Sequence, residues 1–539
     1  MLCVLANRDP PMPIRFPLCI VLVLNAVFYT VVFAQDSTEE TPQTPADVAP
    51  PEPEAKPLPK PTPAKKAPSA TDVKNKEAAA KTKNLQSLKE LNLFWKSVSE
   101  KNRSASLIFP AWIAATPMPS VVAPSPENIW PGMEGFADWK KWVVANPALR
   151  DAIVKSQMCF VIGIPYGQEG LDAKWKAKGI SATPGSAPGE AAFGYLNAMR
   201  GLAAYATICM YVDAENKKFD AAFDISLAML RVLRQVSEQR MEAEKLFGMT
   251  MMSRLLEANR VFMAANIETL PVATLQRVAL KGYAFIKPGD NERLKRLELP
   301  EGDRVILTES MQNAFDEAGQ PNEAYFADEF GEIQSINAPL TRFGAAARWR
   351  QLATVHGPLV ASQEKLVAIY DDWWRRWRMR FYDPILDSPT QFSKLNQSKY
   401  ALVTLFVENL QQVFDARLRL IAEIDGAAMS AALCGFYIDS TKQWPRDLAS
   451  AFPIYGMRRM NFDPFDKNYG NLNYRNLGDK SQPLETAWGQ VQVTGAVLWS
   501  VGPDHEDDGF DAHDPADGTG DLVFWPPPRF LARQAGLLK

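Results

Sequence analysis

The feature that most constrains the fold is a series of apolar residues spaced three and four apart between residues 219 and 267. Residues at these spacings share one face of an α-helix, so the pattern predicts amphipathic helices with a buried face. The series includes Leu227, Leu230, Leu233, Leu246, Met249, Met252 and Leu255. The same spacing continues over most of residues 74–427, where few stretches alternate with a period of two. We therefore predict a body that is a helical bundle or an irregular helical array.

The character of the chain changes after Tyr437. The stretch "VQVTGAVLWSV" (491–501) alternates and is rich in β-branched residues, and "DLVFW" (521–525) is a second short candidate strand before three prolines. Both patterns are typical of β-strands. We therefore expect a mainly α fold with a small α+β module at the C-terminal end, and we divide the chain into a helical domain (74–420) and this module (421–539).

The N-terminal segment 1–34 has the pattern of an export signal. Arg8 and Arg15 precede the apolar run "FPLCIVLVLNAVFYTVVFA", and Val32 and Ala34 are the small residues expected before a cleavage point. The run has nineteen residues, near the lower limit for spanning a bilayer, so a retained anchor is the alternative to cleavage. Both alternatives predict a periplasmic or extracellular protein, and it would contact the cytoplasmic membrane only through this segment if the segment is not cleaved.

Residues 35–73 follow as a proline-rich segment, with ten prolines between positions 36 and 70. Such a composition favours an extended spacer without a core, and at about 3.1 Å per residue it would reach on the order of 100 Å. It would lift the folded body away from a membrane. A disordered leader of no specific use is the other interpretation.

Charge and cysteine content limit the classes of function. The formal net charge of −3 provides no basic surplus to neutralise phosphates, so we expect no nucleic-acid partner. Beyond the N-terminal segment the chain has Cys159, Cys209 and Cys434, widely spaced and without a CxxC pair. One disulfide with a free thiol and three buried free thiols both fit this number.

The most unusual stretch is "SVGPDHEDDGFDAHDPADGTGDLVF" (500–524), which contains eight carboxylates and no Lys or Arg. Ca²⁺ takes six to eight oxygen ligands and tolerates irregular geometry, so a loop rich in Asp and Gly suits it. Gly509, Gly518 and Gly520 permit the sharp turns that wrapping an ion requires. A solvated acidic loop is the alternative. The acids are Asp504, Glu506, Asp507, Asp508, Asp511, Asp514, Asp517 and Asp521.

The spacing within this loop excludes an EF-hand but marks candidate ligands. The series Asp504-x-Glu506-x-Asp508-Gly509 imitates the first half of an EF-hand loop, yet Pro515 occupies the twelfth position, where a bidentate Glu belongs. Asp508 remains a candidate ligand from its spacing alone. His505 and His513 raise the alternative of Zn²⁺ or Mn²⁺, although the abundance of oxygen ligands favours a hard cation.

The C-terminal stretch resembles the C-terminal module of type II secretion major pseudopilins of the G type. The resemblance covers residues 420–525 and rests on "AALCGFYIDSTKQWPRDLASAF", "NFDPFDKNYGNLNYRNLG", "GAVLWSVGPDHEDDG" and "GDLVF" in this order. In that family a helix leads through an Asp-Pro turn, here Asp463-Pro464-Phe465, to a small sheet with a calcium loop. The resemblance implies Asp504, Asp517 and Asp521 as ligands.

Two departures limit what this resemblance implies. The N-terminus lacks the prepilin cleavage motif of the family, and a large helical body replaces the single pilin helix. We therefore do not expect polymerisation. The order of leader, spacer, helical body and tail is also similar to that of exported bacterial proteins without an assigned function. Envelope or secretion-system proteins are the partners that the resemblance implies.

Other conspicuous residues fit structural roles. Trp373 and Trp377 in "DDWWRRWRMRFYD" lie four apart, which is more typical of core packing than of a membrane-surface helix or a platform that stacks carbohydrate or nucleotide. His356 is the only histidine of the body and is a candidate base or a structural residue. Tyr166, with Gln168 and Glu169, lines a turn or a pocket. A Met-rich group favours core packing over Cu(I) binding. Its members are Met241, Met249, Met251, Met252 and Met263.

No enzyme motif such as GxSxG, HExxH or GxxxxGK[ST] occurs in the chain. The sequence therefore favours a non-catalytic exported scaffold or interaction protein with a calcium-stabilised tail. The alternative is an extracytoplasmic hydrolase with a carboxylate acid/base pair in the helical body, whose catalytic residues no motif identifies. A third hypothesis, an envelope-assembly component of a secretion system, rests on the pseudopilin resemblance alone.

Overall fold

The computed structural model describes residues 87–93, 95–167, 169–184, 192–279, 298–330, 344–379, 383–407, 410–451, 463–468, 470–514 and 518–538. The predicted leader (1–34) and the predicted spacer (35–73) lie outside these ranges. Within them the fold is mainly helical, with a small antiparallel sheet near the C-terminal end, so the predicted fold class is confirmed.

The elements in the first half of the chain are the 3-10 turns η1 (Glu100–Asn102) and η2 (Pro126–Asn128) and the helices α3 (Ala105–Ala114), α4 (Phe136–Ala145), α5 (Pro147–Ser156), α6 (Ala173–Ala177), α7 (Tyr195–Glu215), α8 (Phe219–Ser237), α9 (Glu242–Asn266) and α10 (Val272–Arg277). Those in the second half are α12 (Gly302–Ala314), α13 (Glu323–Phe330), α14 (Ala345–Val355), α15 (Leu359–Arg378), η5 (Pro384–Asp387), α16 (Ala401–Val407), α17 (Leu410–Asp439), α18 (Leu448–Ala451), α19 (Pro528–Gln534) and the strands β1 (Asn473–Leu484), β2 (Val491–Ser500) and β3 (Leu522–Trp525).

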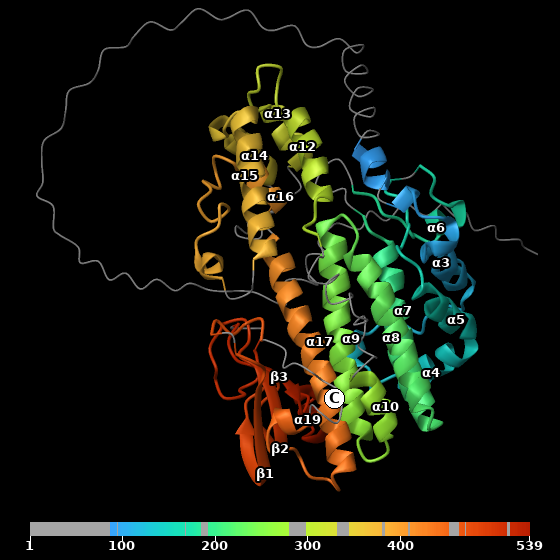
Figure 1. The fold of residues 1–539 in the computed structure, drawn as a ribbon. Helices are drawn as coiled ribbons and strands as arrows, with labels where there is room; N and C mark the ends of the chain where they lie inside the picture. The colour runs from blue at the N-terminus through green and yellow to red at the C-terminus, as the bar shows by residue number, and fades with distance from the viewer. Residues whose placement is uncertain are drawn as a thin grey trace, which may run out of the picture.

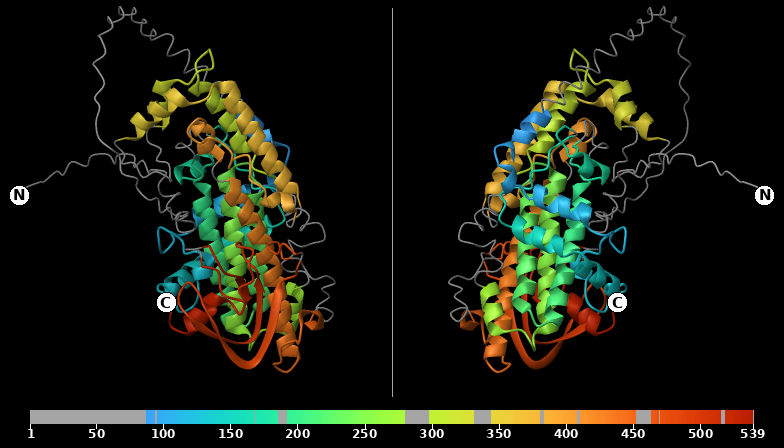
Figure 2. Two further views of the ribbon diagram at one scale, coloured as in Figure 1. Left: turned by 90° about the vertical axis from the view of Figure 1, so that its left-hand side faces the viewer. Right: turned by 90° about the vertical axis from the view of Figure 1, so that its right-hand side faces the viewer.

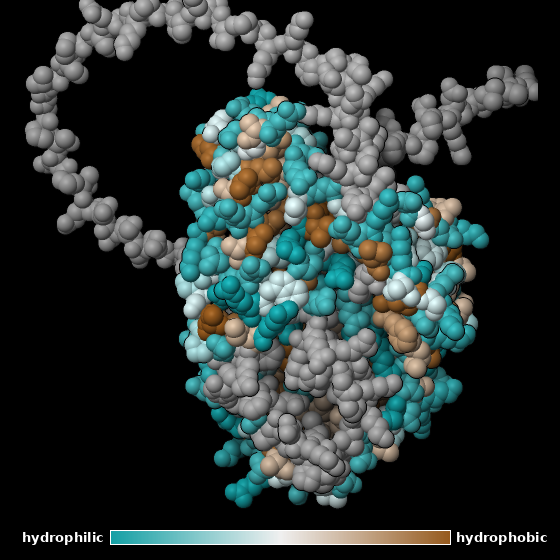
Figure 3. Space-filling model, turned by 45° about the horizontal axis from the view of Figure 1, so that its top comes forward, coloured by the Kyte–Doolittle hydropathy of each residue, from teal (hydrophilic) through white to brown (hydrophobic). Residues whose placement is uncertain are grey.

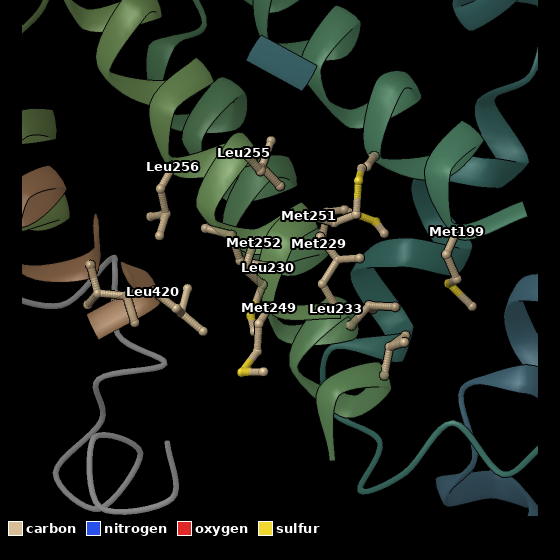
Figure 4. Packing of buried hydrophobic residues seen from close by; sticks show 14 of the residues in the cluster. Met199, Met229, Leu230, Leu233, Met249, Met251, Met252, Leu255, Leu256 and Leu420 are labelled. Atoms are coloured by element: carbon tan, nitrogen blue, oxygen red, sulfur yellow. The ribbon is translucent and has the colours of Figure 1, made fainter. Parts of the chain in front are cut away.

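Four long helices, α7, α8, α9 and α17, run side by side through the middle of the molecule (Figure 1). The α9 helix contacts the other three, so it lies at the centre of the bundle. The apolar residues whose spacing predicted these helices fill the space between them, as Figure 4 shows for Leu230, Leu233 and Leu255. The methionines of the Met-rich group are buried in the same core, which confirms their packing role.

The helix α17 is shared by the body and the C-terminal module, because it continues without a break across positions 420 and 421, where we placed the boundary. The segment Ala401–Asp439, which includes α16 and α17, is long and apolar enough to cross a membrane by length and composition. However, 72% of its most apolar window is buried inside the protein, which is also the pattern of a core helix.

The helices α12 to α16 form the upper end of the molecule in Figures 1 and 2. Trp373 and Trp377 of α15 are buried, which confirms their core role. Arg376 is buried beside them and pairs with Asp372 at 3.2 Å. On the face shown in Figure 3, apolar residues form separate small groups among hydrophilic ones.

The sheet has the order β1-β2-β3 and is antiparallel throughout. The two predicted strands are confirmed as β2 and β3, whereas β1 was not predicted. Its sequence "NYRNLGDKSQPL" contains Gly478 and Pro483, and its register with β2 shifts on both sides of Gly478. These irregularities obscure the period-two pattern. The sheet packs through β2 and β3 against α17, and α19 covers it from the side of α9.

The three described cysteines, Cys159, Cys209 and Cys434, are free and buried. Of the two alternatives that the sequence left open, three buried thiols is therefore the one observed. Burial raises the pKa of Cys209 to about 12, so this thiol stays protonated and behaves as a small apolar side chain.

Candidate functional site

The acidic stretch connects β2 to β3, as predicted, and its base is held by the Asp-Pro turn. The buried Asp463 accepts a hydrogen bond from the hydroxyl of Ser500 at 2.7 Å through Oδ1. Its Oδ2 accepts one from the backbone N–H of Val501 at 2.9 Å. The turn thereby fixes the point where the chain leaves β2. Sequence reasoning named Asp463 as part of the turn but missed this anchoring role.

The two ends of the loop touch each other. Gly502 has a φ of +76°, and a Cβ at this position would lie 2.3 Å from the carbonyl oxygen of Gly520, so the close approach requires glycine. Asp504 continues the closure, because its Oδ2 accepts a hydrogen bond from the N–H of Gly520 at 2.7 Å. One of the predicted ligands thus lies directly beside the segment that carries another, Asp521.

Asp521 is fully buried. Its Oδ2 accepts a hydrogen bond from the N–H of Phe510 at 2.6 Å. Its Oδ1 is buried without a hydrogen-bond partner. Burial, together with the charges of Asp507 and Asp508, raises the pKa of Asp521 to about 7. An unpaired charge is costly when it is buried. Binding either a proton or a cation would therefore stabilise this carboxylate.

Asp508 and Asp517 are the other two predicted ligands. Asp508 is exposed, and partial desolvation together with the neighbouring charges, of which Asp504 contributes most, raises its pKa. Asp517 lies outside the described residues. Among the described residues, no three Asp, Glu, His or Cys side chains are grouped closely enough to hold a metal ion. The calcium site therefore stays a prediction: Asp504 accepts a hydrogen bond from the backbone beside Asp521, and Asp508 is exposed but close enough for its charge to raise the pKa of Asp521.

The two histidines of the loop are tied to backbone carbonyls. His505 donates through Nδ1 to the carbonyl of Phe465 at 2.7 Å, and His513 donates through Nδ1 to that of Thr519 at 2.9 Å. Both rings therefore stabilise turns of the loop. Nothing in the described residues brings them together with the acids at one point, so the structure adds no support for the Zn²⁺ or Mn²⁺ alternative.

A second group of titratable residues lies inside the helical body, centred on Glu244 near the start of α9. The hydroxyls of Tyr166 and Tyr195 each donate to one oxygen of this fully buried carboxylate at 2.6 Å. Burial raises the pKa of Glu244 to about 7, against the opposing effect of these hydrogen bonds. Tyr166 was a candidate pocket residue from sequence, and Gln168 beside it lies outside the described residues.

Two further ionisable groups adjoin Glu244. Burial raises the pKa of Asp303, at the start of α12, to about 6, and its carboxylate accepts a hydrogen bond from the N–H of Glu242 at 2.6 Å. Burial lowers the pKa of Lys245 to about 8. Sequence reasoning missed this cluster. Glu244 is the third residue of α9 and caps its first turn, but the N-cap is Met241 and so no capping-box motif was visible.

A surface hollow of about 410 Å³ lies along α12. Neither Glu244 nor Asp303 lines it. Its walls carry the two acids Glu90 and Glu309 together with Arg304. The hollow is therefore not an entrance to the buried cluster.

His356, the candidate base of the body, has both ring nitrogens engaged. Nδ1 lies 2.8 Å from the carbonyl oxygen of Gly357, and Nε2 accepts from the N–H of Leu402 at 3.3 Å. Burial lowers its pKa, so the ring stays neutral. The structural interpretation of this histidine therefore fits better than the catalytic one.

Comparison with protein-family models, with curated proteins and with solved structures found no match. The likeness of the tail to the pseudopilin module accordingly stays an expectation that rests on the residues quoted for it.

Proposed function

We propose that the protein is a non-catalytic, exported protein of the cell envelope, with a helical body that serves as a scaffold or interaction surface and a C-terminal sheet stabilised by Ca²⁺. The observation that carries the proposal is the buried Oδ1 of Asp521, which has no hydrogen-bond partner. A bound cation would supply the missing partner and offset the cost of the buried charge.

The surroundings of Asp521 support calcium as this cation. Asp504 already lies at the closing point of the loop. Asp508 adds a negative charge close enough to raise the pKa of Asp521. A divalent ion would draw these carboxylates and Asp517 together and relieve their mutual repulsion. Oxygen ligands on a loop rich in glycine are an environment that suits Ca²⁺, which tolerates irregular geometry.

Location and partners belong to the same proposal. The leader and the spacer that the sequence predicts would place the body outside the cytoplasm, in the periplasm or beyond it. Calcium is more plentiful there than inside cells, so mass action would favour the folded tail. Envelope or secretion-system proteins are the proposed partners, by the resemblance of the tail.

Removing calcium should lower the melting temperature at pH 7.5. Saturation at about a hundred times the dissociation constant stabilises a folded state by about 2.7 kcal/mol, so we expect a shift of several degrees between Ca²⁺ and EDTA. The Asp521→Asn variant should lose this response while the metal-free protein keeps its stability, because the amide removes a buried charge. Differential scanning calorimetry measures both effects. Asp138→Asn, at an exposed position, should respond like the wild type.

The calcium response should also depend on pH. Because the pKa of Asp521 is raised to about 7, the metal-free protein loses stability as the pH rises from about 4 through 7, and calcium restores it in the same window. The difference in melting temperature between Ca²⁺ and EDTA should therefore be small at pH 5 and larger at pH 7.5. A calcium response that is absent, or equal in the Asp521→Asn variant, would refute the proposed site.

The alternative function, an extracytoplasmic hydrolase, draws on one observation, the pair of acids Glu90 and Glu309 that lines the hollow beside Arg304. Two carboxylates in one hollow are the minimum for general acid/base hydrolysis. Assays of wild-type protein on ester, amide and glycoside substrates test it. Activity that the Glu309→Gln variant loses would favour the hydrolase, and no activity would favour the scaffold.

A further inference from the structure

Where α19 returns to the helical body, arginines outnumber the acids that face them. Arg254 of α9 lies near Glu127 of η2, and Arg529 of α19 pairs with Glu257 of α9. Arg200 of α7 lies near Glu127, and Arg533 of α19 lies near both Glu127 and Glu257. We call this group the arginine cluster. Its members are Arg200, Arg254, Arg529 and Arg533.

Each of the two carboxylates already has an arginine partner. Arg529 Nε donates to Glu257 Oε1 at 2.9 Å, and the guanidinium also donates to the side-chain oxygen of Asn128 at 2.8 Å. Arg254 Nε lies 3.8 Å from Glu127 Oε1, and Ser125 donates its hydroxyl to the other oxygen at 2.6 Å. The side-chain contacts of the two acids are thus made without Arg200 or Arg533.

Arg200 and Arg533 are left with buried donors that nothing accepts. The Nε of Arg200 is buried without a hydrogen-bond partner. Its guanidinium faces the Phe247 ring at 6.0 Å. Arg533 donates through Nη2 to the backbone carbonyl of Glu127 at 2.8 Å, but its Nε and Nη1 are also buried without a partner. Buried donors of this kind are uncommon in folded proteins and are costly, which suggests a missing acceptor.

The charges of the arginine cluster also indicate a missing anion. Four guanidinium groups face two carboxylates, which leaves an excess of about two positive charges, because arginine keeps its proton at any ordinary pH. Burial lowers the pKa of Arg200, and the neighbouring charge of Arg254 lowers it further. Arg529 acts in the same way on Arg533, whose pKa is also lowered by burial. The cluster is therefore short of negative charge.

We infer that the arginine cluster binds a phosphate group, either as inorganic phosphate or as the phosphate of a lipid headgroup. Guanidinium groups offer planar, paired N–H donors that match phosphate oxygens. A phosphate with about two negative charges would balance the excess and would satisfy the unpaired donors of Arg200 and Arg533. The site is made by α7, α9, η2 and α19 together, so an occupied site would hold the C-terminal helix against the body.

Isothermal titration with inorganic phosphate in calcium-free buffer at constant ionic strength tests the inference. Saturable binding to the full chain is expected, with at least a tenfold loss of affinity in Arg200→Gln and in Arg533→Gln. Arg350→Gln, an exposed position on α14, should bind like the wild type. No saturable phosphate binding to the wild-type protein would overturn the inference even if both variants failed to fold, and so would equal affinity in well-folded variants.

Vesicles separate the two sources of phosphate. Sedimentation with vesicles of phosphatidic acid in phosphatidylcholine, compared with phosphatidylcholine alone, reports lipid binding. Binding that free phosphate displaces and that Arg200→Gln loses would identify a lipid headgroup as the ligand. Binding of free phosphate without vesicle binding would identify the soluble anion. Vesicle binding that Arg200→Gln retains in full would contradict a lipid role for the cluster.

Discussion

Replacing Glu423 by alanine should lower the free energy of unfolding by about 3–5 kcal/mol. Glu423 of α17 forms an ion pair with Arg260 of α9 at 2.5 Å, and the side chains are only 5% and 3% exposed. Removing the acid leaves a buried guanidinium without its counter-charge, which is the costly half of such a pair. Urea denaturation followed by circular dichroism measures the change.

Two controls make this result specific. Asp138→Asn breaks an exposed pair with Lys141, whose side chains are 66% and 79% exposed, and should change stability by less than about 1 kcal/mol. Replacing both Arg260 and Glu423 by methionine should cost much less than Glu423→Ala alone, because no charge stays buried. A loss below about 1 kcal/mol for Glu423→Ala would show that the pair is solvated in solution.

Shortening Phe524 to alanine should cost about 3–5 kcal/mol, since a buried aromatic ring is lost and a cavity is left. Phe524 of β3 is 1% exposed. It lies between Gly426 of α17 and the guanidinium of Arg260, which is 5.1 Å from the ring centroid. Leu537→Ala, at a position that is 44% exposed, is the matched control and should change stability by less than about 0.5 kcal/mol.

Gly426, which packs against this ring, gives an independent check. A Cβ at Gly426 would lie 2.3 Å from Phe524 Cγ, so Gly426→Ala should cost about 1–3 kcal/mol through crowding. In the Phe524→Ala background the same change should cost much less, because the ring with which the methyl group collides is gone. Additive effects of the two substitutions would contradict the contact between α17 and β3.

The helices were predictable because their signal is local. Leu230, Leu233 and Leu255 carry the spacing of a buried helical face within a few turns of chain, and the packing of α8 and α9 uses that face. The strand β1 was not predictable in this way. Its residues fit the sheet only through pairing with β2, and Gly478 interrupts the alternation that would have marked it.

The candidate sites were even harder to predict from local sequence than β1. The density of acids in the loop was visible, yet nothing local distinguishes Asp521, which is fully buried, from Asp508, which is exposed. That difference arises from the fold around β3. Glu244 is less visible still, because its partners Tyr166 and Tyr195 are 78 and 49 residues away. Nothing in the sequence distinguishes these contacts from other possible ones, because only the packing of the helices brings the three residues together.

The continuity of α17 has a practical consequence for dissecting the molecule. A cut at residue 420 would divide α17 after its first third. Each fragment would then expose an apolar helix face to water. Neither half should then be recovered as a well-behaved sample by itself. Force applied to the C-terminal sheet would likewise pass along α17 into the helical bundle. A partner bound to the sheet would therefore be mechanically linked to the bundle.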